Sequence, residues 1–483
     1  MALAANKTKI VATIGPASAS PDILRQLIRA GMDIARLNFS HGEFDWHKAV
    51  IANLRLAARA EGRPVTIMAD LPGPKMRIGQ LANEPIILKQ GDVLTLTTDE
   101  VLGTQQRISA HFPRLLAVVK PGNSLFLNDG NIQLQAVAVA GNDIACRVVI
   151  GGELRSRKGL NLPGIFLGIE AFTPHDHECL KFALEQGVDA VSQSFVETAA
   201  DVEAVRAAAA ALGHAPFIIA KIERAGALEH VDEILKAADG IMVARGDLGV
   251  ETPIERIAVV QKQLIGHANR LGKPVITATQ LLQSMVDRYR PTRAEATDVA
   301  NAILDGTDCV MLSEESAVGK FPVEAVAMLA RIAAATESYR TKDSTWSGLN
   351  DYDVHSDTRL VDLISRNVQQ TVAHLNPAAV IVPTETGHTA RMVARFRLPV
   401  WIAAVSPSDA TCNGLHFSYG VTPLHEPQRP RDWNAFARNW TQKEGLPPTQ
   451  VVLTAGPSPE NPTSNPRLEI IDLQSRETGA QTT

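Results

Sequence analysis

Short apolar runs recur along the chain, and segments whose apolar residues return every three or four positions separate most of them. The runs of strand length cover residues 9–15, 34–42, 65–70, 189–195, 217–220, 240–244, 274–279 and 308–313. The stretch between 220 and 240 places Leu228, Val231, Ile234 and Leu235 on one face, as in an amphipathic helix. Strands that alternate with helices are typical of a parallel sheet, and eight of them predict a (β/α)₈ TIM barrel.

Signals for helix starts support this alternation. Ser20 directly precedes a segment of helical periodicity that begins at about Pro21, so we expect its hydroxyl to cap that helix. Thr292 and Glu295 have the spacing of a capping box before one of the last barrel helices. Both positions follow an apolar run, as a βα unit requires.

The pattern changes after the third run. Helical periodicity is scarce there, and short apolar or alternating runs are separated by turn signals such as Gln90-Gly91 and Asp129-Gly130. This indicates an inserted all-β lid domain, and a further stretch of helix–strand alternation near the C-terminus indicates an α/β domain. The predicted division is a barrel domain in two parts (1–70 and 158–343), the inserted domain (71–157) and the C-terminal domain (344–483).

Composition narrows the class of protein. A chain of 483 residues is too long for one ordinary core, and a formal net charge of -5 without a basic block predicts no nucleic-acid partner. The four cysteines have neither metal-ligand nor redox spacing, and no apolar run is long enough to cross a membrane. We therefore expect a cytoplasmic enzyme with free thiols at Cys146, Cys179, Cys309 and Cys412.

Charged residues follow two neighbouring strands of the predicted barrel. Lys221 and Glu223 end the run that begins at Phe217, and Arg245 and Asp247 end the next one. The carboxyl ends of barrel strands form one rim, so these four side chains are expected to converge there. Carboxylates beside a lysine suit Mg²⁺ and an anionic substrate, whereas an ion-pair network that closes the barrel is the alternative.

The sequence around these charges resembles the signature of pyruvate kinases. The resemblance rests on Ala220-Lys221-Ile222-Glu223-Arg224 and on the stretch 242–251. It extends to residues 13–18, 35–42, 158–164, 278–281, 290–295 and 298–302. It implies a barrel with a β-domain lid, a C-terminal α/β domain, and transfer of a phosphoryl group from phosphoenolpyruvate to ADP as the last step of glycolysis.

The resemblance also implies roles at the rim. Glu223 and Asp247 would hold Mg²⁺, for which Mn²⁺ can substitute, and Lys221 would stabilise charge on the transferred phosphoryl group. Arg36 and Arg77 would grip phosphoryl oxygens. The amides of Gly246 and Asp247 and the hydroxyl of Thr279 would hold the substrate carboxylate. Thr279 would also join the relay that protonates enolpyruvate. On the nucleotide side, the matching positions are His41, Arg77 and Lys158.

A lysine replaces a residue that many pyruvate kinases use beside potassium. By resemblance, the monovalent-cation region comprises Asn38, Ser40 and Asp70, and potassium-dependent members carry glutamate at the position of Lys75. A tethered ammonium is a fixed positive charge that can take the place of the ion. We therefore expect no potassium requirement, with a solvated surface lysine as the alternative.

The C-terminal domain carries a hydroxyl-rich turn between a strand and a helix. Thr384, Thr386, Gly387 and Thr389 resemble an effector loop for a phosphorylated metabolite, although ordinary helix capping explains them as well. The glycine-rich turn often found later in the family is replaced by Pro457-Ser-Pro-Glu-Asn-Pro462. We therefore expect a sugar monophosphate or a nucleotide rather than a sugar bisphosphate.

The barrel departs from the family pattern at three positions. Gly226 stands where a polar or acidic residue is usual, Glu197 where a basic one is common, and Glu314 where a small one is usual. None removes a group that the chemistry needs. Two other functions are alternatives to the kinase: a barrel lyase that acts on phosphoenolpyruvate or an enolate, and a ligand sensor without catalytic activity. We also expect a homotetramer, on the resemblance alone.

Overall fold

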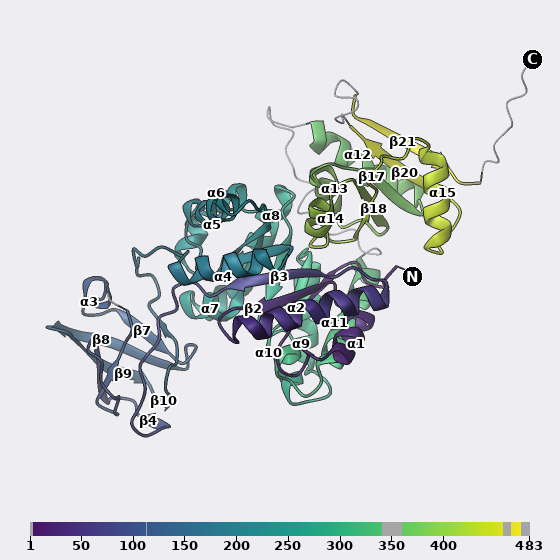
Figure 1. Ribbon diagram of the computed structural model, residues 1–483. Coiled ribbons are helices and arrows are strands. Elements are labelled where there is room, and N and C mark those ends of the chain that lie inside the picture. The colour runs from purple at the N-terminus through teal and green to yellow at the C-terminus, as the bar shows by residue number, and fades with distance from the viewer. Residues whose placement is uncertain (1–2, 113, 341–359, 457–464, 475–483) are drawn as a thin grey trace, which may run out of the picture.

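The computed structural model describes residues 3–112, 114–340, 360–456 and 465–474, which form a closed barrel, a β domain and a C-terminal sheet covered by helices (Figure 1). The barrel strands are β1 (Lys9–Thr13), β2 (Ile34–Asn38), β3 (Thr66–Leu71), β12 (Ala190–Gln193), β13 (Phe217–Ile222), β14 (Gly240–Ala244), β15 (Val275–Ala278) and β16 (Cys309–Leu312). All eight run parallel, and each pairs with its neighbour in this order until β16 closes on β1. The predicted (β/α)₈ barrel is confirmed.

Helices cover the outside of the barrel. They are α1 (Pro21–Ala30), α2 (Phe44–Glu61), α4 (Pro174–Glu185), α5 (Ala199–Ala211), α6 (Val231–Ala237), α7 (Arg245–Glu251), α8 (Ile257–Arg270), α9 (Arg293–Leu304), α10 (Glu314–Ala317) and α11 (Pro322–Arg340). The hydroxyl of Ser20 accepts the amide of Ile23, and Thr292 and Glu295 form a reciprocal capping box, as predicted. The helix expected between β13 and β14 is shorter than its periodicity, because a 3₁₀ turn (Gly226–Glu229) precedes α6.

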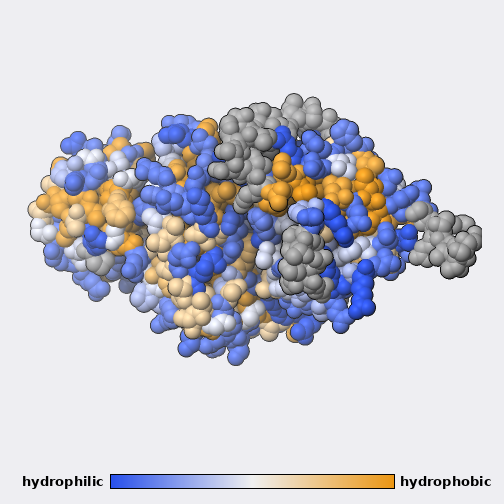
Figure 2. Space-filling model, turned by 90° about the horizontal axis from the view of Figure 1, so that it is seen from above, coloured by the Kyte–Doolittle hydropathy of each residue, from blue (hydrophilic) through white to orange (hydrophobic). Residues whose placement is uncertain are grey.

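The β domain is inserted between β3 and α4 and has its own core. A six-stranded sheet has the order β11-β7-β8-β9-β5-β6, and β4 pairs with β10. These elements are β4 (Ile86–Leu88), β5 (Val93–Thr97), β6 (Arg107–Ser109), α3 (Leu115–Val118), β7 (Ser124–Leu127), β8 (Ile132–Ala140), β9 (Asp143–Ile150), β10 (Gly152–Leu154) and β11 (Leu160–Asn161). Figure 2 shows an apolar area over this domain, where Val93, Val137 and Ile150 are exposed.

The C-terminal sheet has the order β19-β18-β17-β20-β21, with only β21 antiparallel to its neighbour within the described sheet. Its elements are α12 (Leu360–Leu375), β17 (Ala379–Pro383), α13 (His388–Ala394), β18 (Trp401–Ser406), α14 (Asp409–Leu415), β19 (Val421–His425), α15 (Trp433–Lys443), β20 (Gln450–Ala455) and β21 (Arg467–Asp472). The expected start at 344 and the 457–462 stretch lie outside the described residues. The exact domain boundaries remain predictions.

The C-terminal domain covers the amino-terminal end of the barrel strands. Phe417 is fully buried there among residues of the barrel interior and stacks on Phe217, with ring centroids 5.2 Å apart. Arg397 pairs with Asp308 at 2.8 Å, just before β16. The β domain and the C-terminal domain therefore lie on opposite sides of the barrel, which leaves the carboxyl-terminal rim facing the β domain (Figure 1).

All four cysteines are buried, unpaired thiols, as expected. Among the helices in the described parts of the chain, none combines the length and apolar character needed to cross a membrane.

Candidate active site

Lys221 lies at the end of β13 with acceptors on several sides. Its Nζ is 2.9 Å from Glu223 Oε1 and 3.2 Å from Asp70 Oδ1, and it donates to Ser194 Oγ at 2.7 Å. Burial alone would lower the pKa of Lys221, but Asp70 and Glu223 outweigh it, so the pKa is raised. Lys221 is therefore held as a cation at the rim of the barrel.

Asp70, at the end of β3, connects Lys221 with Arg36 of β2. The Nε of Arg36 donates to Asp70 Oδ2 at 2.9 Å, and its Nη1 donates to Thr13 Oγ1 at 2.9 Å. Ser192 Oγ donates to Asp70 Oδ1 at 2.7 Å. Burial opposes ionisation of Asp70, but Arg36 and Lys221 hold its pKa well below the usual range. Arg36 is thus oriented by an ionised partner.

Glu223 and Asp247 bring two carboxylates to adjoining strand ends. Glu223 Oε2 accepts the amide of Phe195 at 2.8 Å. Burial and the charge of Glu223 raise the pKa of Asp247 to about 6, against the opposing charges of Lys221 and Lys75. Two carboxylates that oppose each other fit a divalent cation whose other ligands are water and substrate oxygens. No cluster of three or more metal-binding side chains occurs within the described residues.

Thr279 brings the predicted carboxylate-binding groups together. Its Oγ1 accepts the amide of Gly246 at 2.7 Å and donates to the carbonyl of Ala278 at 2.7 Å. The peptide of Thr279 adopts a left-handed conformation, with φ of 69°. Its hydroxyl therefore lies at the first turn of α7, beside Gly246 and one residue from Asp247.

Arg245 does not join this group, contrary to the expectation that four charges converge. Its Nη1 pairs with Asp298 Oδ2 at 2.8 Å and its Nη2 donates to the carbonyl of Thr279 at 2.7 Å. The reason is helical geometry: α7 begins at Arg245, and two positions along a helix turn the side-chain direction by about 200°. Asp247 therefore faces Glu223 while Arg245 faces α9.

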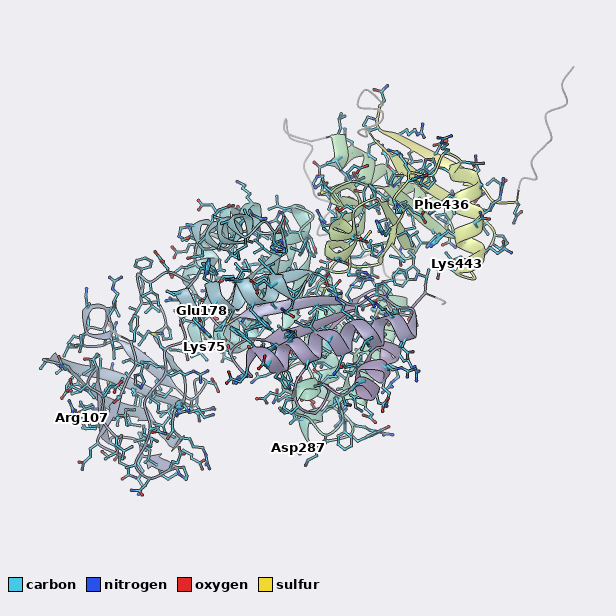
Figure 3. All side chains as sticks on the ribbon, viewed as in Figure 1. Lys75, Arg107, Glu178, Asp287, Phe436 and Lys443 are labelled. Carbon is cyan, nitrogen blue, oxygen red and sulfur yellow. The ribbon has the colours of Figure 1, made fainter. Side chains whose placement is uncertain are left out.

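Lys75 stands at the junction of the β domain and the barrel (Figure 3). Lys75 is exposed and lines a cavity. Partial burial there, followed by the charge of Lys221, lowers its pKa against the effects of Glu223, Asp70 and Asp247. The structure thus brings Lys75 close to Asp70, one of the groups with which it was predicted to act. Asn38 and Ser40, the two other groups of the predicted cation region, lie beside Asp70. Asn38 is paired with Asp70 between β2 and β3, and Asn38 Oδ1 accepts the amide of Ser40 at 3.1 Å.

The residues predicted for the nucleotide side, His41, Arg77 and Lys158, lie around the same junction. Burial lowers the pKa of His41, and the nearby charges of Lys75, Arg77 and Arg36 lower it further. Arg77 Nη1 donates to the carbonyl of Arg157 at 3.0 Å, which ties together the two connections of the β domain. Lys158 lies on the return connection, where its carbonyl accepts the amide of Ile78, and its side chain has no assigned hydrogen bond or ion pair within the described chain.

A cavity of about 110 Å³ opens between the β domain and the rim. Its lining includes Lys75, Arg77, Asp129, Glu197, Arg224 and Asp247. Asp129 comes from a turn of the β domain whose Gly130 reaches Val250 of α7. The sequence analysis did not identify Asp129, Ser192 or Ser194 as site residues. The polar Ser-Gln-Ser stretch at the end of an otherwise apolar strand was a usable signal for the two serines.

The predicted effector loop lies on the C-terminal domain, between β17 and α13. Thr384 Oγ1 accepts the amide of Gly387 at 2.9 Å, and the carbonyl of Thr386 accepts Arg391 Nη2 at 2.9 Å. Thr384 borders a cavity of about 200 Å³ that also contains Glu385, Glu426, Arg429 and Trp433. Thr386 is exposed and Thr389 is half-buried in the first turn of α13. The N-cap of α13 is Gly387, and no side-chain hydrogen bond caps this helix, so the Thr384 contact closes the turn that precedes it.

Comparison with known proteins identifies the family. The family model described as pyruvate kinase, barrel domain, matches residues 5–326, and the one described as pyruvate kinase, alpha/beta domain, matches residues 362–470. The chain belongs to the pyruvate kinase family.

Individual pyruvate kinases agree over most of their length. The pyruvate kinase of Thermococcus litoralis is 47% identical over 426 residues, which are 88% of this chain and 90% of that protein. The pyruvate kinase of Geobacillus stearothermophilus is 45% identical over 433 residues, 87% of this chain and 72% of that protein. That of Corynebacterium glutamicum is 41% identical over 417 residues, 86% of both. These relatives support a pyruvate kinase enzyme.

Proposed function

We propose that the chain transfers the phosphoryl group of phosphoenolpyruvate to ADP, producing pyruvate and ATP, with Lys221 at the centre of the site. The observation that carries this proposal is the contact of Lys221 with both Asp70 and Glu223, beside Asp247. A coupled assay of pyruvate formation from phosphoenolpyruvate and ADP tests it. Release of pyruvate without ADP would instead support hydrolysis or a lyase reaction.

The roles of the side chains follow from charge. A loose phosphoryl-transfer transition state spreads negative charge over its equatorial oxygens, so fixed cations stabilise it. Lys221 and Arg36 are the fixed cations on the barrel, while His41, Arg77 and Lys158 would face the nucleotide. Thr279 would hold the substrate carboxylate with the amides of Gly246 and Asp247. It would also pass a proton towards the enolpyruvate carbon through a relay, since its own hydroxyl is too weak an acid.

Glu223 and Asp247 would hold Mg²⁺, which supplies positive charge to substrate oxygens when bound. Their mutual repulsion, visible in the raised pKa of Asp247, supports this assignment. Removal of divalent ions with a chelator should abolish turnover, and Mg²⁺ or Mn²⁺ should restore it. Full turnover in the chelated enzyme would contradict the assignment.

Lys75 would supply the positive charge that potassium supplies in other members. The proximity of its ammonium to Glu223, Asp70 and Asp247 supports this proposal. Rates in potassium salts should equal rates in tetramethylammonium salts at equal ionic strength, which keeps screening constant. Activation by potassium of about tenfold, equivalent to ~1.4 kcal/mol, would show that Lys75 does not fill this role.

The 384–389 loop would bind a phosphorylated effector. The adjoining cavity contains two carboxylates, Glu385 and Glu426, and one arginine, Arg429, which is unfavourable for a bisphosphate. An aromatic ring, Trp433, borders the same cavity and could stack on a nucleotide base. Calorimetry with sugar monophosphates, nucleotides and sugar bisphosphates should detect binding only of the first two classes. Binding that survives alanine at Thr384, Thr386 and Thr389 would exclude this loop.

A homotetramer remains our expectation for the assembly, on the basis of family membership. Light scattering coupled to gel filtration gives the mass directly, for comparison with 51.9 kDa per chain.

A further inference from the structure

Arg224 directly follows the carboxylate Glu223, and no role has been assigned to it above. Its side chain is only 7% exposed. One terminal nitrogen, Nη2, donates to the carbonyl of Ile165 at 2.8 Å, and the other, Nη1, lies 3.5 Å from Glu197 Oε2. Arg224 thereby links two segments. One is the connection that returns from the β domain, which contains Ile165, and the other is the loop after β12, which contains Glu197.

Both connections of the β domain are attached to the barrel rim. On the outgoing side, the amide of Gly73 donates to Asp176 Oδ1 at 2.9 Å. On the return side, the carbonyl of Ala171 accepts Gln193 Nε2 at 2.8 Å, and the carbonyl of Ile165 accepts Arg224. Of these two contacts on the return connection, the one at Ile165 lies nearer to the β domain along the chain. Among these attachments, those made by Asp176 on the outgoing side and by Arg224 on the return side use a charged side chain.

The position of Glu197 depends on Gly226. A Cβ at Gly226 would lie 2.2 Å from Glu197 Oε1, so the carboxylate occupies the space that any side chain at 226 would need. These are two of the positions where the chain departs from the family pattern. Glycine at 226 and glutamate at 197 together place an anion where Arg224 can pair with it.

The two connections also pair with each other and carry nucleotide-side groups. The amide of Ile78 donates to the carbonyl of Lys158, and the amide of Leu160 donates to the carbonyl of Met76. Arg77 and Lys158 therefore move as one unit with the connections. A contact that fixes the return connection also fixes where these groups stand relative to Glu223 and Asp247.

We infer that Arg224 is a positioning residue for nucleotide binding, which acts by holding the return connection at Ile165 through its pairing with Glu197. This inference rests on the proposed function, because it takes ADP to bind between the connections and the barrel rim. Phosphoenolpyruvate, held by groups of the barrel itself, depends less on this contact.

Arg224→Gln tests the inference by steady-state kinetics. The KM for ADP should rise about tenfold, as expected for loss of a charged hydrogen-bonded contact, while the KM for phosphoenolpyruvate changes less than about twofold. Arg224→Lys should fall between wild type and Arg224→Gln, because one ammonium reaches Ile165 or Glu197 but not both. A fall in the melting temperature with both KM values unchanged would overturn the inference.

Gly226→Ala breaks the same contact without changing any charge. Its methyl group displaces the Glu197 carboxylate, which can move because it ends a flexible side chain. The KM for ADP should rise as in Glu197→Gln, and the double variant should be no worse than either single one. An unchanged KM for ADP in Gly226→Ala would contradict the inference even if Arg224→Gln failed to fold.

Arg206→Gln is the matched control. Arg206 also bridges one carbonyl, of Ala237, and one carboxylate, of Asp239, but on the barrel exterior away from the connections. Its kinetics should equal those of wild type. Hydrogen exchange gives a readout that needs no activity: the amides of residues 164–169 should exchange faster in Arg224→Gln than in Arg206→Gln. Equal exchange would overturn the positioning role, whereas an inactive wild type would overturn the proposed function instead.

Discussion

Two cations, Arg36 and Lys221, and three carboxylates, Asp70, Glu223 and Asp247, lie together at the barrel rim. Arg36 and Lys221 share Asp70, and Lys221 also contacts Glu223. Each cation therefore keeps a fixed position and a fixed charge before substrate arrives, so little reorganisation accompanies charge development in the transition state. Lys221 is the cation with contacts to both the Asp70 side and the Glu223 side of the site.

Lys221→Ala should lower kcat by about a thousandfold or more, equivalent to ~4 kcal/mol, with a smaller loss in phosphoenolpyruvate affinity. The moving charge needs this ammonium more in the transition state than in the ground state. Stopped-flow or coupled steady-state rates measure the effect, and circular dichroism verifies folding, since the variant removes one buried partner from both Asp70 and Glu223. A kcat within about tenfold of wild type would exclude this role.

Lys75→Glu should convert a potassium-independent enzyme into a potassium-dependent one. The substitution replaces a tethered cation with a carboxylate close to Glu223, Asp70 and Asp247, and the added negative charge needs a bound cation to balance it. Rates at equal ionic strength with potassium or tetramethylammonium give the measurement. Lys120→Glu, at an exposed position of the β domain, is the control and should leave the cation response unchanged.

At the scale of elements, the turn after α14 closes the end of the barrel opposite the site. Phe417 is inserted among Met68, Ile219 and Met311, which come from three barrel strands. Its ring stacks on Phe217, the first residue of the strand that ends near Lys221. The guanidinium carbon of Arg391, in α13, lies 5.9 Å from the centre of the Phe217 ring. The barrel core is therefore completed by a side chain from the C-terminal domain.

Phe417→Ala should lower the free energy of unfolding by about 3–5 kcal/mol, since it leaves a cavity inside a closed barrel. Urea unfolding followed by tryptophan fluorescence measures the change, and Phe417→Leu should cost less because it fills part of the space. Phe166→Ala, at a position 72% exposed, should change stability by no more than about 0.5 kcal/mol. A similar small change in Phe417→Ala would show that the turn does not contribute to the core.

At the scale of the whole molecule, buried polar groups join the barrel to the C-terminal domain. Lys9 donates to the carbonyl of Val421 at 2.8 Å, and Asn413 donates to Asp189 at 2.7 Å. His416 is buried in the same contact, where burial, with Lys9 and Arg63, lowers its pKa to about 4 against the effect of Asp33. The contact between the two domains therefore favours a neutral imidazole at His416.

Stability should fall as the pH drops from about 6.5 to 4, because the unfolded chain takes up a proton on His416 before the folded chain does. The stabilisation is complete above the unfolded pKa and is lost towards the folded value of about 4. The total difference is on the order of 3 kcal/mol. Denaturant midpoints should lose this part of their pH dependence in His416→Gln and keep it in His214→Gln, an exposed control. Parallel profiles for all three proteins would contradict the assignment.

The sequence by itself determined the architecture and the position of the site. Eight apolar runs separated by helical periodicity predicted the barrel because strand and helix patterns are local. Lys221, Glu223 and Asp247 were predicted as neighbours because the carboxyl ends of parallel strands share one rim. Asp70 and Lys75 were placed correctly near them through the family resemblance. The barrel and the grouping of Lys221, Glu223 and Asp247 needed only periodicity, strand direction and residue type, whereas the placement of Asp70 and Lys75 needed the resemblance.

Only the tertiary structure decided which side chains meet. Arg245 pairs with Asp298 rather than with the rim carboxylates, because the first turn of α7 directs it to the other side. Asp129 reaches the site from the β domain, and Phe417 reaches the barrel interior from the C-terminal domain. No local pattern predicts these contacts, since each joins residues far apart in the chain, and those of Asp129 and Phe417 also depend on how the domains dock. The order and direction of the strands determine which strand ends form the rim of the barrel. The way in which helices and domains pack against that rim determines which further side chains reach the site.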